Sequence, residues 1–214
     1  MDEVMDKDKL LELITKAVIE ELQSQKRHIP VGVSARHIHV AREDLDILYG
    51  SGYQLHKLKP LMADDFASEE TVTLVGPNLR TIEHVRILGP ERKNTQVEIA
   101  RTDAFKLGIN PPVRASGDIA GSASIVVVGP KGALNLKEGC ILANRHIHMT
   151  PQDAESIGLK DNVYVNVKAY GEKGAILYKV QVRVNEKFTT EMHIDTDDAN
   201  AVGLHSGDLV EILI

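Results

Sequence analysis

The residues of this chain best suited to chemistry are two pairs of histidines, each pair separated by one residue. His37 and His39 lie in one copy of the tetrapeptide Arg-His-Ile-His, and His146 and His148 lie in a second copy. In a β-strand, residues i and i+2 point to the same face, so the two imidazoles of a pair can converge on one ion. The sequence therefore predicts two metal-binding strands.

A second internal similarity supplies a third ligand in each half. Residues 97–109 align without gaps with residues 192–204, and this alignment places Glu98 opposite His193. The predicted ligand sets are His37, His39 and Glu98 in the first half, and His146, His148 and His193 in the second half. Three protein ligands with an open fourth position are typical of catalytic zinc. We expect a duplicated module of about 100 residues with one metal site in each copy.

The donor types restrict the ion without deciding it. A lone His-x-His pair can be an ordinary strand feature, but two copies with aligned third ligands favour metal binding. Zinc is the expected ion, and sets rich in nitrogen also permit iron, nickel or manganese. Cys140 is the single cysteine, which excludes a disulfide framework, and we expect it to be a small buried hydrophobe.

Several basic residues near the predicted sites could bind an anion. A metal ion with an open position polarises a carbonyl or binds an anionic oxygen or thiolate. Arg36, Arg145 and Arg92 are candidates, because the planar guanidinium matches two phosphate oxygens. For Arg92 and Lys93 the alternative is a solvated loop cluster. The histidines without a repeated partner are interpreted as surface or packing residues: His28, His56, His84 and His205.

Alternating apolar and polar residues predict the strands that would position these ligands. The clearest pair is 163–167 and 180–184, joined by a hairpin at 171–174. The further predicted strands are 71–75, 82–88, 96–100, 123–128 and 208–213. Thr150 and the proline that follows it predict the start of a short helix. We expect a mainly β fold of two duplicated small β-barrels with short capping helices.

Residues 1–24 differ from the rest of the chain. Apolar residues at helical spacing, including Leu10, Ile14 and Val18, predict an amphipathic helix. It would either pack on the surface of its own domain or place its apolar stripe on a partner, and the polar segment 23–27 favours the second interpretation.

The bulk composition limits the class of protein. The chain has 214 residues and a formal net charge of −6, which argues against a nucleic-acid coat. We expect no membrane span, because the chain has no run of about 18 apolar residues. The acidic start of the chain, with Asp2 and Glu3, does not predict a signal peptide. A cytoplasmic location is the expectation.

Three segments together resemble one enzyme family. They are VGVSARHIHV at 31–40, NRHIHMTPQDA at 144–154 and MHIDTDDANAVGL at 192–204. From about residue 28 to its C-terminus the chain resembles the PduL-type phosphotransacylases, which are phosphate propanoyltransferases of bacterial microcompartments. The resemblance implies two β-barrels with two zinc ions between them. It also implies reversible acyl transfer between coenzyme A (CoA) and inorganic phosphate, with acyl-CoA and phosphate as substrates.

The resemblance also implies roles for individual residues. The metal ligands of the family map onto the two predicted ligand sets, and its phosphate-binding and catalytic arginine maps onto Arg92. Its CoA contacts map onto Val33, Ser34, Ala35 and Asn200. By analogy, residues 36–143 form one barrel, inserted into a second that consists of residues 25–35 and 144–214. Transfer is expected to be direct, without an acyl-enzyme.

Residues 1–24 look like the targeting helix of family members that reside in microcompartments. We therefore expect a location inside a bacterial microcompartment and contact with a shell or cargo protein. A homodimer is also expected, because barrel edges are exposed.

Two other functions are compatible with the ligand sets. One is a dinuclear metallohydrolase of thioesters or phosphate esters, and the other is a non-catalytic metal-binding scaffold. The acyl chain length is not determined, since one methylene changes binding by only about 1–3 kcal/mol.

Overall fold

The computed structural model describes residues 7–214, and these residues form fourteen strands and five helices. One closed barrel uses six strands from both ends of the chain, in the order β1-β13-β10-β12-β11-β14. Its strands are β1 (His28–Ser34), β10 (His146–Met149), β11 (Tyr164–Ala169), β12 (Ile176–Val184), β13 (Glu191–Asp195) and β14 (Leu209–Leu213). This C-terminal barrel therefore takes β1 from the start of the chain and its other strands from the final third.

The strands between β1 and β10 form the other ring, which we call the inserted barrel. Its order is β4-β5-β2-β6-β9-β8, and it closes because β8 pairs with both β9 and β4. Its strands are β2 (His37–Ala41), β4 (Phe66–Val75), β5 (Thr81–Arg92), β6 (Gln96–Glu98), β8 (Ala123–Val128) and β9 (Ala133–Ala143). Two short strands, β3 (Lys57–Pro60) and β7 (Val113–Arg114), pair with β4 and β9. The predicted mainly β fold with two barrels is confirmed.

The two rings have the same pairing pattern. The strand that carries the histidine pair is parallel to one neighbour, β5 or β12, and antiparallel to the strand of the third predicted ligand, β6 or β13. That third strand is in turn parallel to β9 in one ring and to β1 in the other. This equivalence supports the duplication inferred from the sequence repeat.

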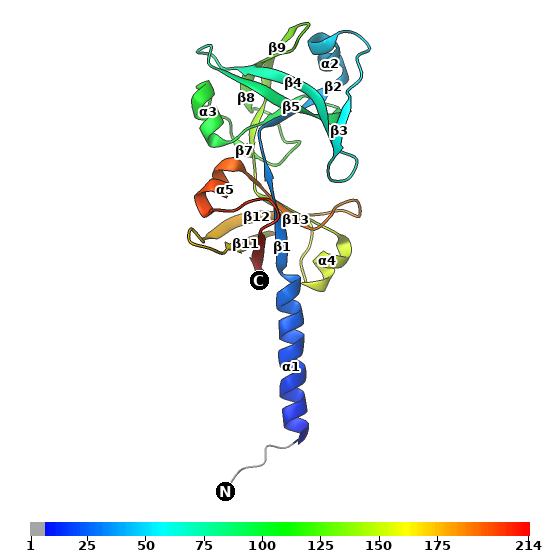
Figure 1. Ribbon diagram of the computed structural model, residues 1–214, viewed down its shortest axis with the longest axis vertical. Helices are drawn as coiled ribbons and strands as arrows, with labels where there is room; N and C mark the ends of the chain where they lie inside the picture. Colours follow the sequence, from blue (N-terminus) through cyan, green and yellow to red (C-terminus); the bar gives the residue numbers. More distant parts are fainter. Residues whose placement is uncertain (1–6) are drawn as a thin grey trace.

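The chain crosses between the barrels immediately before each histidine pair. β1 belongs to the C-terminal barrel and leads into β2 of the inserted barrel, while β9 of the inserted barrel leads into β10 of the C-terminal barrel. Figure 1 shows β1 running from the lower barrel up towards the upper one. Because both histidine pairs begin just after a crossing, the topology places them at the junction of the barrels.

Each barrel is filled by its own cluster of aliphatic side chains. Ile38, between the first two histidines, and Ile147, between the second two, are both fully buried in these clusters. The two-residue period of a strand sends the isoleucine into the core and its neighbouring imidazoles to the opposite face. Full burial of such a side chain contributes about 1.5–3 kcal/mol, so the core holds the histidine strands in this orientation.

Four short helices cap the barrels, and two of them occupy equivalent places. The helices are α2 (Arg42–Tyr49), α3 (Arg101–Leu107), α4 (Pro151–Ser156) and α5 (Thr196–Val202). α3 and α5 follow the third-ligand strands, and both end at a glycine in the left-handed conformation, Gly108 or Gly203. The helix predicted after Thr150 is α4, and the Thr150 side chain caps it by accepting from the backbone N–H of Asp153.

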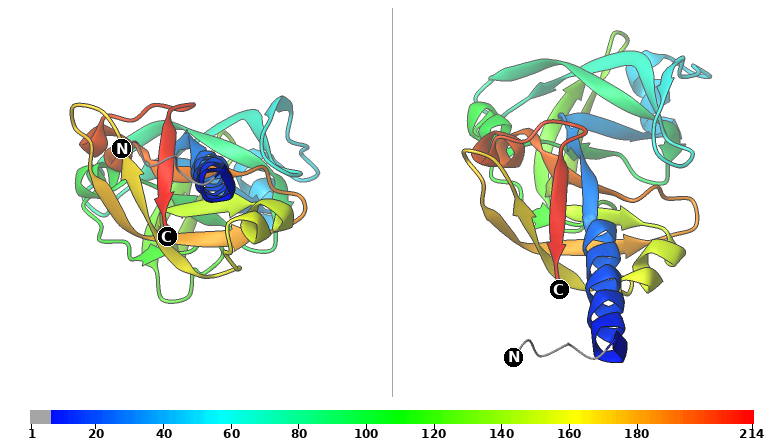
Figure 2. Two further views of the ribbon diagram at one scale, coloured as in Figure 1. Left: turned by 90° about the horizontal axis from the view of Figure 1, so that it is seen from below. Right: turned by 60° about the horizontal axis from the view of Figure 1, so that its bottom comes forward.

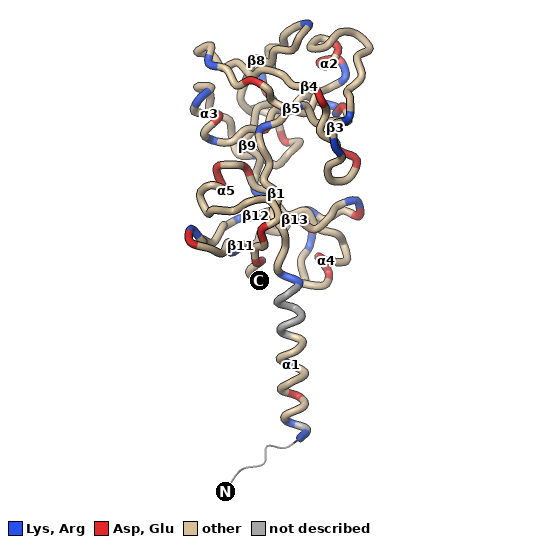
Figure 3. The backbone as a smooth tube through the Cα atoms, in the orientation of Figure 1, with Lys and Arg blue, Asp and Glu red and all other residues tan. Residues whose placement is uncertain are grey.

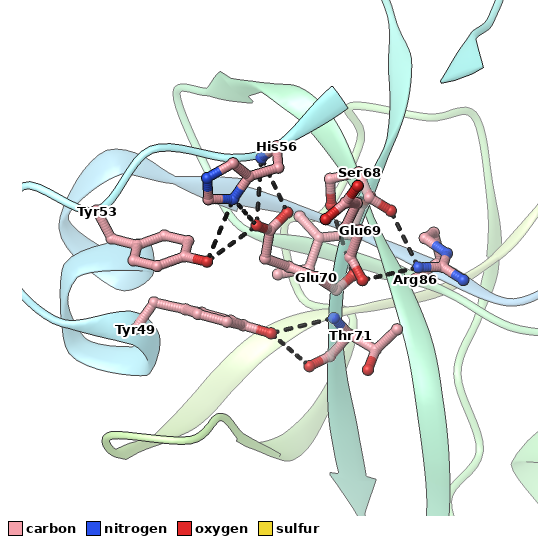
Figure 4. Close-up of polar contacts among 9 residues, drawn as sticks. Tyr49, Tyr53, His56, Ser68, Glu69, Glu70, Thr71 and Arg86 are labelled. Atoms are coloured by element: carbon pink, nitrogen blue, oxygen red, sulfur yellow. Dashed lines mark hydrogen bonds and ion pairs between the residues drawn. The ribbon is translucent and has the colours of Figure 1, made fainter. Parts of the chain in front are cut away.

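A hydrogen-bond network supports β5, the strand beside the first histidine pair (Figure 4). β4 has an irregular register at this point, and the Ser68 hydroxyl donates to the Ile87 carbonyl at 2.9 Å. The Arg86 guanidinium donates to the Ser68 carbonyl at 3.0 Å. On the other side of the irregularity, the buried Glu70 carboxylate accepts from the ring of His56 at 2.7 Å. The irregular segment of β4 is therefore hydrogen-bonded to β5 through Ser68 and to His56 through Glu70.

The N-terminal helix α1 (Lys7–Lys26) projects away from both barrels (Figures 1 and 2). Its large apolar side chains that the structure describes are exposed: Leu10, Leu11, Leu13, Ile14, Val18 and Ile19. The predicted helix is therefore observed from Lys7 onwards, and the first six residues of the segment 1–24 lie outside the described residues. The sequence allowed this helix either to pack on its own domain or to bind a partner, and in the structure it does not pack along its own barrel.

Charged residues of both signs are spread over the loops of both barrels (Figure 3). This mixed distribution agrees with the modest net charge of −6. Within residues 7–214, no helix combines the length and the apolar character needed to cross a membrane.

Candidate metal centre between the barrels

The structure brings each predicted ligand set together in a compact group, which we call a cage. The first cage consists of His37, His39 and Glu98, and the second cage consists of His146, His148 and His193. Within each cage the candidate ligand atoms lie within 4.8 Å of one another. Strand register explains this, because the first histidine of each pair lies directly opposite the third ligand on the antiparallel neighbour.

The first cage is buried and its carboxylate is held by two donors. His39 is 3% exposed and Glu98 is 8% exposed. The Ser116 hydroxyl and the Gln96 side-chain amide donate to Oε1 of Glu98, at 2.8 and 2.5 Å. The other carboxylate oxygen lies 3.5 Å from Nε2 of His37. The donors therefore direct Oε2 towards the imidazoles.

The second cage is built from three imidazole rings. Their centroids lie between 4.6 and 5.3 Å apart. The ring of Phe188 packs on His148 with a centroid distance of 4.2 Å, and the Nε2–H of His193 donates to the Glu191 carboxylate at 2.9 Å. An aromatic ring and a carboxylate thus hold two of the three ligands from outside the cage.

The first histidine of each cage is oriented by a backbone carbonyl. The Nδ1–H of His37 donates to the carbonyl of Ala35 at 2.9 Å, and the Nδ1–H of His146 donates to the carbonyl of Asn144 at 2.8 Å. A hydrogen bond at one ring nitrogen selects the tautomer whose other nitrogen can bind a metal. Nε2 is therefore the ligand atom of both residues.

The second histidine of each cage has a buried nitrogen without a partner. Nδ1 of His39 and Nδ1 of His148 are shielded from water and accept or donate no hydrogen bond among the described residues. Buried polar atoms are nearly always paired, so these two nitrogens indicate a missing ligand. An ion at the centre of each cage would satisfy them. The nitrogen and carboxylate donors fit a divalent metal ion, and each cage can bind one.

Burial keeps the imidazoles neutral, which is the form that binds metal. Burial, reinforced by neighbouring cations, lowers the pKa of His39 to about 3 and that of His148 to about 2. Burial also lowers the pKa of His146 to about 4. For Glu98, burial favours the neutral acid, but the imidazoles of the first cage outweigh it and lower the pKa of this carboxyl. All four groups are therefore in their metal-binding forms near pH 7.

The two cages face one cavity between the barrels. His37 and Glu98 of the first cage line this cavity together with His146 and His193 of the second. The cages also interact electrostatically, because Glu98 and His146 influence each other's pKa. A ligand in this cavity would therefore contact residues of both cages.

The arginines that precede the histidine pairs are engaged in equivalent ion pairs. Nε of Arg36 lies 2.9 Å from Asp103, and Nε of Arg145 lies 2.7 Å from Asp198. The two aspartates occupy the same position in α3 and α5, so each ion pair ties a crossing segment to the helix that follows the third ligand. Both arginines, predicted as candidate anion anchors, are thus engaged through Nε in ion pairs, and Arg36 also lines the cavity.

Arg92 and Arg183 lie close enough to the cages to influence their histidines. Arg92 lowers the pKa of His39, and Arg183 lowers that of His148. The guanidinium of Arg92 also pairs with Asp65 at 2.8 Å. Arg92 is thus near the first cage, as its predicted phosphate role requires, but it is bound to a carboxylate.

The predicted CoA contacts are divided between two places. Ser34 and Ala35 line the cavity, at the crossing from β1 to β2. Val33 is not among the residues that line it, and its backbone N–H donates to the Ser206 hydroxyl at 3.0 Å. Asn200 is an exposed residue of α5 that the lining also excludes.

Sequence reasoning missed several residues around the cages. They are Gln96, Ser116, Phe188, Arg183 and Glu191. Extending the alignment of residues 97–109 with residues 192–204 by one position pairs Gln96 with Glu191, so this pair had a signal. The others are brought to the cages by strand pairing and loop packing. The histidines predicted as surface or packing residues lie outside both cages: His28, His56, His84 and His205.

Comparison with known proteins gives a consistent result. The family model described as phosphate propanoyltransferase matches residues 30–205. The chain is 53% identical over 211 residues to the phosphate propanoyltransferase of Lachnoclostridium phytofermentans, which covers 96% of this chain and 99% of that protein. It is 51% identical over 197 residues to the phosphate propanoyltransferase of Thermotoga maritima, which covers 91% of this chain and 93% of that protein. The family model and these relatives cover nearly the whole chain, so the chain, with its two candidate metal cages, belongs to the phosphate propanoyltransferase family.

Proposed function

We propose that this protein catalyses the reversible transfer of a propanoyl group between CoA and inorganic phosphate. Propanoyl-CoA and phosphate would give propanoyl phosphate and free CoA. The observation that carries the proposal is the pair of cages facing one cavity, in a chain of this family. Both substrates are anionic, so a cavity with two metal positions would offset the repulsion between them.

Zinc is the proposed ion in both cages. The three-ligand sets leave a position open for substrate, and iron, nickel or manganese would also suit these donors. When bound, the two ions would polarise the thioester, stabilise the departing thiolate and offset the charge of phosphate. The first cage would hold its ion through two imidazoles and a carboxylate, and the second cage through three imidazoles.

Arg92 is the proposed phosphate-binding and catalytic residue. Its guanidinium would exchange the Asp65 carboxylate for two phosphate oxygens and hold phosphate beside the first cage. The proposed CoA contacts are Val33, Ser34, Ala35 and Asn200. Ser34 and Ala35 support this best, because they line the cavity that both cages face.

Direct transfer from CoA to phosphate is the proposed route. Cys140 is fully buried in the core of the inserted barrel, and burial raises the pKa of its thiol to about 12. A thiol in that state is not a nucleophile at neutral pH. The residues around the cavity would therefore bind and orient the two substrates so that phosphate attacks the thioester itself.

The proposed domains follow the two strand rings. Residues 36–143 would form one domain, and residues 25–35 together with 144–214 would form the other. The membership of β1 in the C-terminal ring supports this division.

The N-terminal helix is proposed to dock on a shell or cargo protein of a bacterial microcompartment. Support comes from its exposed apolar side chains and its projection from the barrel. The family model also begins at residue 30, after this helix. A cytoplasmic location inside such a compartment is part of the proposal, and the homodimer stays a prediction.

One experiment separates the proposed transferase from its alternatives. Purified protein is supplied with propanoyl-CoA, with and without inorganic phosphate, and free thiol is measured alongside metal content. Phosphate-dependent thiol release with about two zinc ions per chain is expected. Release without phosphate would indicate a thioester hydrolase, and two bound ions without turnover of any acyl-CoA would indicate a scaffold. Acetyl-CoA and butanoyl-CoA in the same assay test the choice of acyl chain.

A further inference from the structure

Glu191 is hydrogen-bonded through its carboxylate to His193, the third ligand of the second cage. It lies two residues before His193 on β13, and its Oε2 accepts the Nε2–H of that imidazole at 2.9 Å. An imidazole protonated at Nε2 has Nδ1 free to bind an ion. The hydrogen bond therefore decides which nitrogen of His193 faces the cage.

The equivalent residue of the first cage is Gln96. Gln96 lies opposite His39, as Glu191 lies opposite His148, and it also bonds to the third ligand of its cage. The carboxylate has a different place in the two pairs, Glu98 with Gln96 and His193 with Glu191. In the first cage the carboxylate is the ligand and the amide is its neighbour, whereas in the second cage the imidazole is the ligand and the carboxylate is its neighbour. Each cage thus has one carboxylate, as a ligand in the first cage and beside a ligand in the second.

Space for the Glu191 carboxylate is provided by a glycine on the adjacent strand. Gly32 lies beside His193, and a Cβ added at Gly32 would come within 3.0 Å of the Glu191 carboxylate. At the equivalent place in the inserted barrel, Ile141 lies beside Glu98 and is fully buried. The glycine therefore opens room for a carboxylate at the second cage where the first has a branched side chain.

The surrounding cations are also matched between the cages. Arg92 acts on His39, and Arg183 lies beside His148 on β12 and acts on it in the same sense. With one carboxylate and one guanidinium at each cage, the two ions would experience a similar local charge. Without Glu191, the second ion would have three neutral imidazoles and Arg183 beside it, and Glu98 would act on it only from the first cage.

We propose that Glu191 is a positioning residue of the second metal site, where it orients His193 and supplies the negative charge that Glu98 supplies in the first. This inference rests on the proposed metal sites. Carboxylates that hold a metal-binding histidine from behind contribute about 10–100-fold to metal affinity. The second site is therefore expected to depend on Glu191 and the first site is not.

Zinc titration of single-site proteins tests this role. Full-length, metal-free protein is titrated with zinc against a competing chelator in two backgrounds, His37→Ala, which leaves the second cage intact, and His146→Ala, which leaves the first intact. In the His37→Ala protein, which keeps the second cage, Glu191→Gln is expected to weaken zinc binding 10–100-fold. In the His146→Ala protein, which keeps the first cage, it should weaken zinc binding less than twofold. Glu186→Gln, which removes an exposed carboxylate from the preceding loop, is the matched control and should change neither.

Glu191→Gln is also titrated with both cages intact, where only the zinc affinity of the second cage should fall. This measurement does not depend on the folding of the single-site variants. Long-range ¹H–¹⁵N spectra of the imidazoles give a second readout. Zinc-loaded protein should show His193 bound through Nδ1 and protonated at Nε2, and Glu191→Ala should disturb that signature. Unchanged zinc affinity of Glu191→Gln would overturn the role of Glu191 alone. Wild-type protein that binds no zinc would overturn the proposed metal sites as well.

Discussion

The inserted barrel and the C-terminal barrel share one backbone plan but surround their metal positions differently. Both place a histidine pair opposite a third ligand, and both tie the preceding arginine to an aspartate. The first cage has a buried carboxylate ligand with a neutral neighbour, Gln96. The second has three imidazoles with the acidic neighbour Glu191. The two barrels therefore share their strand pairing and differ in the side chains around the two candidate metal positions.

Loss of one ligand from either cage is expected to have the largest effect. His37→Ala and His146→Ala should each remove about one of two zinc ions and reduce kcat/KM for phosphate-dependent thiol release by more than about 100-fold, since the proposed reaction uses both ions. Elemental analysis and the thiol assay measure this. If one variant kept full activity, the two cages would not form one catalytic unit.

Arg92→Ala is expected to raise the KM for phosphate by about 10–100-fold, because a bidentate guanidinium is lost from the first cage. Asp65→Ala should lower this KM by a few fold, since it frees Arg92 from its ion pair. Steady-state kinetics with varied phosphate measures both. An equal increase from Arg183→Ala would show instead that both cages share the phosphate.

The metal-free protein is expected to lose stability as the pH falls. Burial lowers the pKa of His39, His146 and His148 to about 3, about 4 and about 2, while in the unfolded chain they titrate near 6.5. Below about pH 6.5 the unfolded state therefore takes up protons that the folded state does not. Stability should be full above that pH and fall towards pH 4, by up to about 1.4 kcal/mol per pH unit for each histidine.

Urea unfolding in the presence of chelator, from pH 7.5 to 4.5, measures this dependence. Two of the three histidines belong to the second cage. The double variant His146→Gln/His148→Gln should therefore reduce the pH dependence of the free energy of unfolding more than His39→Gln does. An equal reduction would show that the two cages contribute alike.

The two supporting ion pairs should differ in strength. Asp103 is 5% exposed and also accepts from the backbone N–H of Ala100 at the start of α3, so Asp103→Ala should lower the free energy of unfolding by about 2 kcal/mol. Asp198 is less buried, and Asp195 caps its helix, so Asp198→Ala should cost about 1 kcal/mol or less. Urea unfolding of both variants measures the difference, and the reverse order would contradict it.

Removal of residues 1–26 should have the smallest effect on catalysis. The helix projects away from both barrels (Figure 1), and none of its described residues lines the cavity, so kcat/KM should stay within about twofold. Binding to a microcompartment shell or cargo protein should be lost. Leu11→Asp/Ile14→Asp in the full chain tests the apolar surface without shortening the protein, and unchanged binding would argue against docking.

Part of the fold was predictable from short-range pattern. The hairpin of β11 and β12 and the cap of α4 depend on neighbouring residues, and both were predicted. The local pattern did not mark β1 as a strand, because Pro30 and Gly32 weaken it and its partners, β13 and β14, lie at the other end of the chain. The assignment of residues 25–35 to the barrel of residues 144–214 came from the family resemblance alone. The chain crosses between the barrels after β1 and again after β9, and neither crossing has a signal in the local sequence pattern.

The sequence by itself determined the ligand types, the duplication and the pairing of Glu98 with His193, because these follow from residue identity and spacing. Only the tertiary structure decided that the cages face one cavity, that Arg36 and Arg145 pair with Asp103 and Asp198, and that Glu191 lies behind His193. These features depend on contacts between strands from different parts of the chain, such as Gly32 beside His193, which residue spacing along one strand does not specify.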